Sequence, residues 1–89
     1  MYRVYWEPEI IAKISRVYDG LDEMDREKLL IALELLDAQL LKDPMVVGES
    51  RESIFVRVAT EHPITIAFRV NSDQRVVRVS GTSYFRRKS

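Results

Sequence analysis

Residues 53–80, SIFVRVATEHPITIAFRVNSDQRVVRVS, decide the fold because apolar and polar side chains alternate through three successive segments. An alternation with a period of two is typical of a β-strand that buries one face. The residues EHP at 61–63 and NSDQ at 71–74 separate the segments and favour turns. We therefore predict a three-stranded antiparallel meander whose arginines point away from the core.

The register of this meander follows from the rule that facing residues lie on the same side of a sheet. A three-residue turn at 61–63 places Val58 opposite Ile66 and Arg57 opposite Ala67. A four-residue turn at 71–74 places Ala67 opposite Arg78. The outer face then carries a row of Arg57, Ala67 and Arg78, and a second row of Phe55, Arg69 and Val76. Together these rows form a shallow basic floor.

The first half of the chain predicts one strand and two helices. Residues 2–6, YRVYW, alternate and are rich in β-forming residues. Pro8 suits the first turn of a helix, and apolar residues at three- and four-residue spacing extend that helix to about Asp19. Asp22 or Asp25 can cap a second, leucine-rich helix, which ends at Asp43 because the residue before a proline avoids helical geometry.

These elements predict an α+β fold with an N-terminal strand, an antiparallel two-helix hairpin and the three-stranded antiparallel meander. The short link between the helices favours a hairpin packed on one face of a four-stranded sheet. The connection at 45–52 contains Gly48, which indicates a positive φ. A chain of 89 residues is expected to form a single domain, residues 1–89. The sequence leaves open which strand pairs with the first.

Composition narrows the functional classes. The chain has no cysteine, which excludes a disulfide framework and a thiolate metal site. It shows neither a secretory signal nor an uncharged apolar run of about 18 residues, so we expect a cytoplasmic protein without a membrane partner. The single histidine, His62, lies in a predicted turn without partner spacing, so we expect no metal and no cofactor.

The charge is unevenly distributed although the formal net charge is zero. Residues 1–50 hold six Lys or Arg against eleven Asp or Glu, a net charge of −5, and residues 51–89 hold eight against three, a net charge of +5. This asymmetry fits a basic face for a polyanion or an acidic partner, and it fits a solvated sheet face equally well. Arginines with nearby aromatic residues suit single-stranded RNA better than a duplex groove.

Several stretches resemble the RelE/ParE superfamily of bacterial type II toxins. They are ALELLDAQLLKDPMVVGESR, with its helix-ending DP and its GESR at 48–51, then FVRV, then ITIAFRVNSDQRVVRVSGTSYFRR. The resemblance covers nearly the whole chain, and the order of the elements carries much of it. It implies the α+β fold described above, and it implies the toxin half of a toxin–antitoxin pair.

The resemblance implies two possible activities. RelE-like members cut mRNA at the ribosome without a metal, with basic and polar residues on the sheet, whereas ParE-like members inhibit DNA gyrase. Both kinds are neutralised by a cognate antitoxin. The expected partners are therefore an antitoxin together with the ribosome and mRNA, or an antitoxin together with DNA gyrase. A third reading is an inactive relic that only binds its antitoxin.

Position by position, the resemblance assigns Arg51, Arg57 and Tyr84, and the other candidates come from the predicted basic sheet face and the C-terminal segment. The catalytic candidates are Arg57, Arg69, Arg78 and Tyr84. The substrate-binding candidates are Arg51, Phe55, Arg86 and Arg87. The chain departs from the family pattern at two places, because Thr65 stands where an arginine is usual and Ser83 where a histidine is frequent. These departures leave no obvious general acid and favour the non-catalytic alternative.

Overall fold

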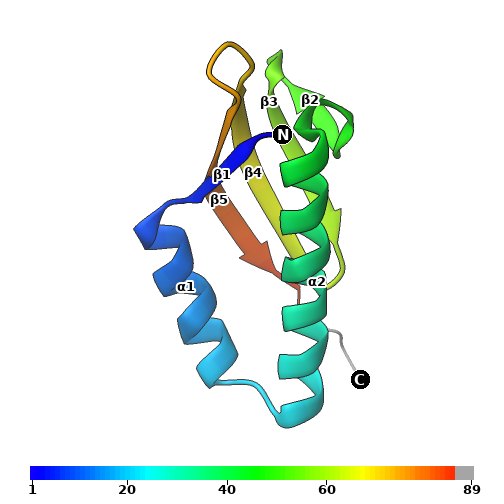
Figure 1. The fold of residues 1–89 in the computed structure, drawn as a ribbon. Helices are drawn as coiled ribbons and strands as arrows, with labels where there is room; N and C mark the ends of the chain where they lie inside the picture. Colours follow the sequence, from blue (N-terminus) through cyan, green and yellow to red (C-terminus); the bar gives the residue numbers. More distant parts are fainter. Residues whose placement is uncertain (86–89) are drawn as a thin grey trace.

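The computed structural model describes residues 1–85 and confirms the α+β fold with both helices on one face of the sheet (Figure 1). The helical half begins with a strand and ends with a short 3₁₀ helix: β1 (Arg3–Trp6), α1 (Pro8–Asp19), α2 (Glu23–Lys42) and η1 (Pro44–Val46). The remaining strands are β2 (Glu49–Arg51), β3 (Ser53–Glu61), β4 (Ile64–Asn71) and β5 (Val76–Tyr84). Arg86 and Arg87, which were predicted to bind substrate, lie outside the described residues.

The sheet has five strands in the order β1-β5-β4-β3-β2 rather than the four that were predicted. The additional strand, β2, is only three residues long and fully exposed, so its sequence ESR carries no alternation that would reveal it. β1 pairs in parallel with β5, which answers the question that the sequence left open. All other neighbouring strands are antiparallel.

Both helices have the predicted start and stop signals. α1 begins at Pro8 and ends at Asp19. The Asp22 carboxylate accepts a 2.8 Å hydrogen bond from the Asp25 backbone N–H and so caps α2, which ends one residue before Asp43. In Figure 1 the two helices meet at the short link and diverge in front of the sheet, with α1 on one side of α2.

The core lies between the helices and the sheet. α2 contributes Leu29, Ala32, Leu36 and Leu40, all at most 1% exposed. β4 presents alternating buried residues, and the sheet side of the core consists of Ala59, Ile64, Ile66, Phe68, Val70, Val77 and Val79. Burying this apolar surface is the main stabilising term of the fold, and it leaves the opposite face of the sheet open to a partner.

The predicted β3–β4 register is wrong by one residue. The turn holds only His62 and Pro63, so Glu61 pairs with Ile64, Arg57 pairs with Phe68 and Val58 pairs with Ala67. A shift of one residue exchanges the two faces of a strand. Arg57 therefore lies on the helix-covered face, on the same side as buried Ala59, and the predicted outer row of Arg57, Ala67 and Arg78 does not form.

Gly48 fits against β3 in this register. Its φ is +67°, as the sequence indicated, and it packs directly on β3. A Cβ atom at this position would overlap the backbone oxygen of Val58 and lie 2.8 Å from the Ala59 Cβ. This close approach turns Ala59 and Arg57 toward the connection at 44–48. Alternation alone gives no sign of it, because Val56 and Val58 are equally apolar in either orientation.

The β4–β5 register differs from the predicted one by two residues, which preserves the faces. The turn is formed by residues 72–75, with Arg75 at a φ of +55°, and Val70 pairs with Val77. An irregularity follows, because Phe68 pairs with Val79 but Ala67 pairs with Gly81. Ser80 is thus the extra residue of a β-bulge, a feature that bends a strand and increases its twist.

Candidate functional site

Two arginines face each other across β4 and β5 on the outer face of the sheet, the face without helices. Arg69 pairs with Arg78, and both side chains are exposed. Their strand neighbours complete one row across four strands, with Tyr5 beside Arg78 and Val56 beside Arg69. Like charges directly opposite each other destabilise a sheet. Such a pair becomes favourable when an anion lies between the two guanidinium groups.

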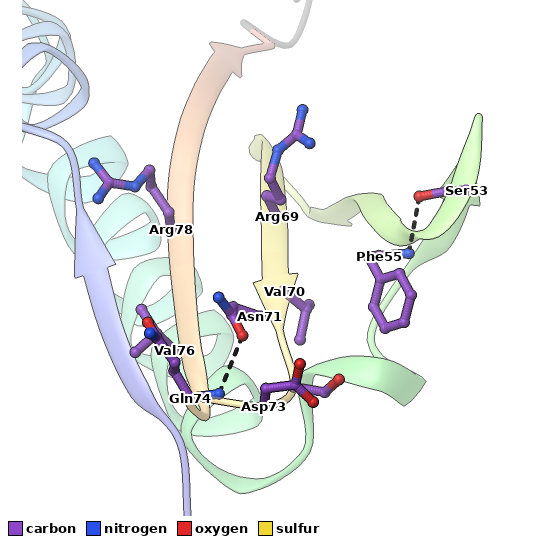
Figure 2. Close-up of a pocket in the computed structure, with 10 residues that line it drawn as sticks. Ser53, Phe55, Arg69, Val70, Asn71, Asp73, Gln74, Val76 and Arg78 are labelled. Carbon is purple, nitrogen blue, oxygen red and sulfur yellow. Dashed lines mark hydrogen bonds between the residues drawn. The ribbon is translucent and has the colours of Figure 1, made fainter.

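The two arginines differ in their surroundings. Arg78 stacks over the Tyr5 ring at 4.9 Å, and its Nη1 lies 3.7 Å from the Glu7 carboxylate at 31% side-chain exposure. The Arg69 side chain has no hydrogen-bond or ion-pair partner within residues 1–85. Figure 2 shows Arg78 directed toward β1 and Arg69 extended along its own strand. Arg78 is therefore held in position, whereas Arg69 is available to a ligand.

A hollow of about 490 Å³ lies beside this pair (Figure 2). The turn after β4 forms its floor, where the Asn71 side chain accepts a 3.1 Å hydrogen bond from the Gln74 backbone N–H. Phe55, 40% exposed, borders the hollow from the part of β3 that precedes its pairing with β4. The predicted row of Phe55, Arg69 and Val76 does not form, because Arg69 pairs with Val56 and Arg78. The remaining lining residues are Ser53, Val70, Ser72, Asp73 and Val76. Guanidinium groups, an aromatic ring and small polar groups are the components of a site for phosphate and an unpaired base.

Arg57, predicted to be catalytic, instead holds the backbone together. Its Nε donates to the Val47 carbonyl at 2.9 Å, its Nη2 to the Gly48 carbonyl at 3.1 Å and its Nη1 to the Ile54 carbonyl at 3.2 Å. The bonds to Val47 and Gly48 join β3 to the connection that leads from α2, and the bond to Ile54 lies within β3. With its donors directed at backbone oxygens on the helix-covered side, Arg57 is separated from the Arg69–Arg78 pair by the sheet.

Tyr84 also lies on the helix-covered side. It pairs with buried Ile64, and its ring packs against the core next to Ile14 and Val17 of α1. The bulge at Ser80 decides this orientation, since one extra residue in β5 reverses the alternation that follows it. From the sequence, Tyr84 was predicted near the end of the sheet face that carries the arginines. In the structure it lies beneath α1 instead.

The two positions that depart from the family pattern are neighbours on the outer face. Thr65 pairs with Ser83, and the Thr65 hydroxyl oxygen lies 2.7 Å from that of Thr60. This group of hydroxyls occupies the end of the sheet opposite the 72–75 turn. Arg51, predicted to bind substrate, lies on β2 and forms a 3.5 Å exposed ion pair with Glu49. It is not part of the hollow.

Sequence reasoning missed two contributors to this site. The sequence analysis assigned Tyr5 only to a strand, although its ring supports Arg78. Its role depends on the parallel pairing of β1 with β5, and the sequence left the partner of β1 open. Asn71 was assigned to a turn, but its hydrogen bond to Gln74 shapes the floor of the hollow. An Asn followed by Ser and Asp is a typical signal for such a turn.

A second hollow lies between the helices and differs in chemistry. It measures about 440 Å³ and is lined mainly by apolar side chains, including Trp6, Ile11, Ile14 and Leu33. The Trp6 indole N–H donates a 3.0 Å hydrogen bond to the Asp37 carboxylate at its edge.

Among residues 1–85 no group of three or more His, Cys, Asp or Glu is arranged to hold a metal ion. None of the described helices combines the length and apolarity that spanning a membrane requires.

The fold is similar to that of the E. coli RelE toxin. The crystal structure of the isolated toxin in its P21 form matches with a TM-score of 0.63 and 14% identity over 99% of this chain and 88% of that chain. The crystal structure of the intact E. coli RelBE toxin-antitoxin complex matches with a TM-score of 0.66 and 14% identity over 98% and 100% of the two chains. By sequence, the chain matches no protein-family model and no curated protein. At this identity the similarity shows the RelE-like fold alone.

Proposed function

We propose that this protein is the toxin component of a toxin–antitoxin pair and that its outer sheet face binds the phosphate backbone of single-stranded RNA. The observation that carries the proposal is the cross-strand pair of Arg69 and Arg78 beside the hollow bordered by Phe55, on a RelE-like fold. Two opposed arginines favour an anion between them, and the aromatic ring can stack on a base. For a toxin that binds RNA through this face, the proposed target is mRNA at the ribosome.

A cleaving toxin would use Arg69 and Arg78 to neutralise the scissile phosphate. The described part of the outer face offers no imidazole or lysine ammonium beside that pair, and Asp73 is the one carboxylate among the residues lining the hollow. A non-catalytic toxin is therefore the second candidate. It is favoured specifically by the placement of Arg57 and Tyr84 on the helix-covered side. In that case the same face would bind a macromolecule, DNA gyrase included, without cutting it.

The proposed partner is a cognate antitoxin with acidic side chains. It would cover Arg69 and Arg78 and so block the groups that a nucleic acid needs. Charge pairs at such an interface contribute about 2–5 kcal/mol when one partner is lost. The double variant Arg69→Glu with Arg78→Glu should bind the product of the neighbouring gene more weakly and with less dependence on salt. Equal binding by parent and variant at low and high salt would remove this face from the antitoxin interface.

The test of the proposed function is induction of the chain in a bacterial host, followed by mapping of mRNA ends. We expect growth arrest. Cuts in mRNA that are phased with codons would identify the cleaving toxin, whereas arrest with intact mRNA would identify the non-catalytic toxin. The double variant Arg69→Gln with Arg78→Gln should relieve the arrest. Arg16→Gln with Lys28→Gln removes the same charge from exposed helix positions and should not. Absence of arrest with the parent, or arrest that persists in the Arg69 and Arg78 variant, would contradict the proposal.

A further inference from the structure

α2 is apolar on two sides, although only one side is covered. Leu29, Ala32, Leu36 and Leu40 pack into the core. On another side of the same helix Met24, Ile31 and Leu35 are 67%, 50% and 45% exposed. A surface helix ordinarily carries one apolar stripe with polar residues opposite, so a second stripe indicates a surface that packs against something else.

The exposed stripe has the spacing of a coiled-coil seam. Its positions follow one another at alternating intervals of four and three residues, which keeps them on one line along a helix. We call them the α2 seam: Met24, Lys28, Ile31, Leu35, Ala38 and Lys42, all exposed. The two large branched residues occupy its centre and the two lysines lie toward its ends. We propose that the α2 seam pairs antiparallel with the α2 seam of a second copy of this chain, forming a homodimer.

Self-complementarity supports a second copy as the occupant. A two-fold axis near residue 33 brings Ile31 of one copy against Leu35 of the other, twice, as an isologous interface requires. The same axis places Lys28 opposite Ala38 and Lys42 opposite Met24. Each Lys42 then lies beside Glu23 and Glu27, at the acidic start of the other α2. The central apolar contacts and the end charges are thus satisfied by one arrangement.

The charges also select the antiparallel orientation. A parallel pair would place Lys28 against Lys28 and Lys42 against Lys42 in the seam, where like charges repel. In the antiparallel pair each positively charged C-terminal turn approaches a negatively charged N-terminal turn, and the helix dipoles oppose each other. The dimer leaves the other surfaces free, because Leu33 and Asp37 line the inter-helix hollow from a different side of α2. The Arg69–Arg78 pair lies across the sheet from both helices.

The first test is sedimentation equilibrium of the parent chain over a range of concentrations. One helix pair forms a small interface, so we expect a Kd on the order of 1–100 μM and a mass that rises from 10.4 kDa toward twice that value. Ile31→Lys with Leu35→Lys should weaken dimerisation at least about tenfold, since lysine keeps the helix but buries charge in the seam. The control Ile11→Lys with Leu30→Lys alters residues of similar exposure, 53% and 45%, outside the α2 seam and should leave the Kd unchanged.

The second test uses the absence of cysteine from the sequence. In the antiparallel dimer, a mixture of Ile31→Cys and Leu35→Cys chains should form a mixed disulfide on mild oxidation. Disulfides between identical variants should form less readily, because position 31 faces position 35 rather than itself. Faster cross-linking of identical variants would indicate a parallel pair and overturn the orientation. A parent that stays monomeric at 100 μM or above, or a seam variant that dimerises like the parent, would overturn the dimer itself.

Discussion

The two faces of the sheet use arginine in opposite ways. On the helix-covered face, Arg57 is half-buried and its three donors reach three backbone carbonyls within 3.2 Å. On the outer face, Arg69 is exposed, has no such partner among the described residues and lies opposite another arginine. The residue type is the same and the strands are adjacent. What differs is whether the backbone already satisfies the guanidinium group.

This difference separates an arginine that holds the fold from one that can bind a ligand. A half-buried cation that donates to several carbonyls stabilises the native state, and its removal leaves acceptors without partners. An exposed cation beside a like charge contributes little to stability or reduces it. Stability and ligand binding should therefore respond oppositely to substitutions on the two faces, and the following variants test that contrast.

The largest effect is expected for Arg57→Met, which keeps an unbranched side chain but removes all three hydrogen bonds. Losing bonds to a charged donor should lower the free energy of unfolding by about 2–3 kcal/mol. Urea denaturation followed by circular dichroism measures this change. RNA binding by the folded fraction should remain. A loss below about 0.5 kcal/mol would mean that water replaces the guanidinium group without cost.

A second contrast compares the two aromatic residues that were both predicted to contact substrate. Tyr84→Ala removes a ring packed against α1 and should lower the free energy of unfolding by about 2 kcal/mol. Phe55→Ala should change stability far less but should weaken binding to single-stranded polyuridine by about 1–2 kcal/mol, the contribution of one stacked base. Thermal unfolding and fluorescence anisotropy provide the two readouts. The reverse assignment of effects would contradict the placement of these rings.

The smallest effect on stability is expected for Arg69→Thr. It relieves the repulsion with Arg78 and places a good β-former on an exposed strand position, so unfolding should become less favourable by about 0.3 kcal/mol. RNA affinity should fall, and the slope of log K against log salt should become shallower by about 1. Titrations at several salt concentrations measure this slope. An unchanged slope would show that Arg69 contacts no phosphate.

Elements whose signals are local were predictable from the sequence. Pro8, Asp22 and the Asp43-Pro44 step set the helix ends, and the strict alternation of β4 identified its buried face. The errors arose where long-range packing decides. Gly48 packs against Val58 and Ala59, about ten residues away, on the side of β3 that the sequence placed outward. The bulge at Ser80 reorients the end of β5, and the hydrophobic pattern does not show it.

The candidate site was predictable only in part for the same reason. Arg69 and Arg78 were correctly placed on the outer face, because a shift of two residues preserves alternation. Arg57 and Tyr84 were placed on that face incorrectly, because an odd shift and a bulge each reverse it. An arginine in a valine-rich strand does not indicate by itself whether backbone carbonyls or solvent will surround it.

The parallel pairing of β1 with β5 has a consequence for how the chain folds. It joins residues 3–6 to residues 76–79, so β1 cannot pair until β5 has been synthesised. The helices and the β3–β4 hairpin have closer partners and can form while the chain is still emerging from the ribosome. Contacts of such large sequence separation slow folding, because the entropy of closing the chain must be lost before they form. Tyr5 is brought to Arg78 by this pairing, so the orientation of Arg78 depends on a contact between the two ends of the described chain.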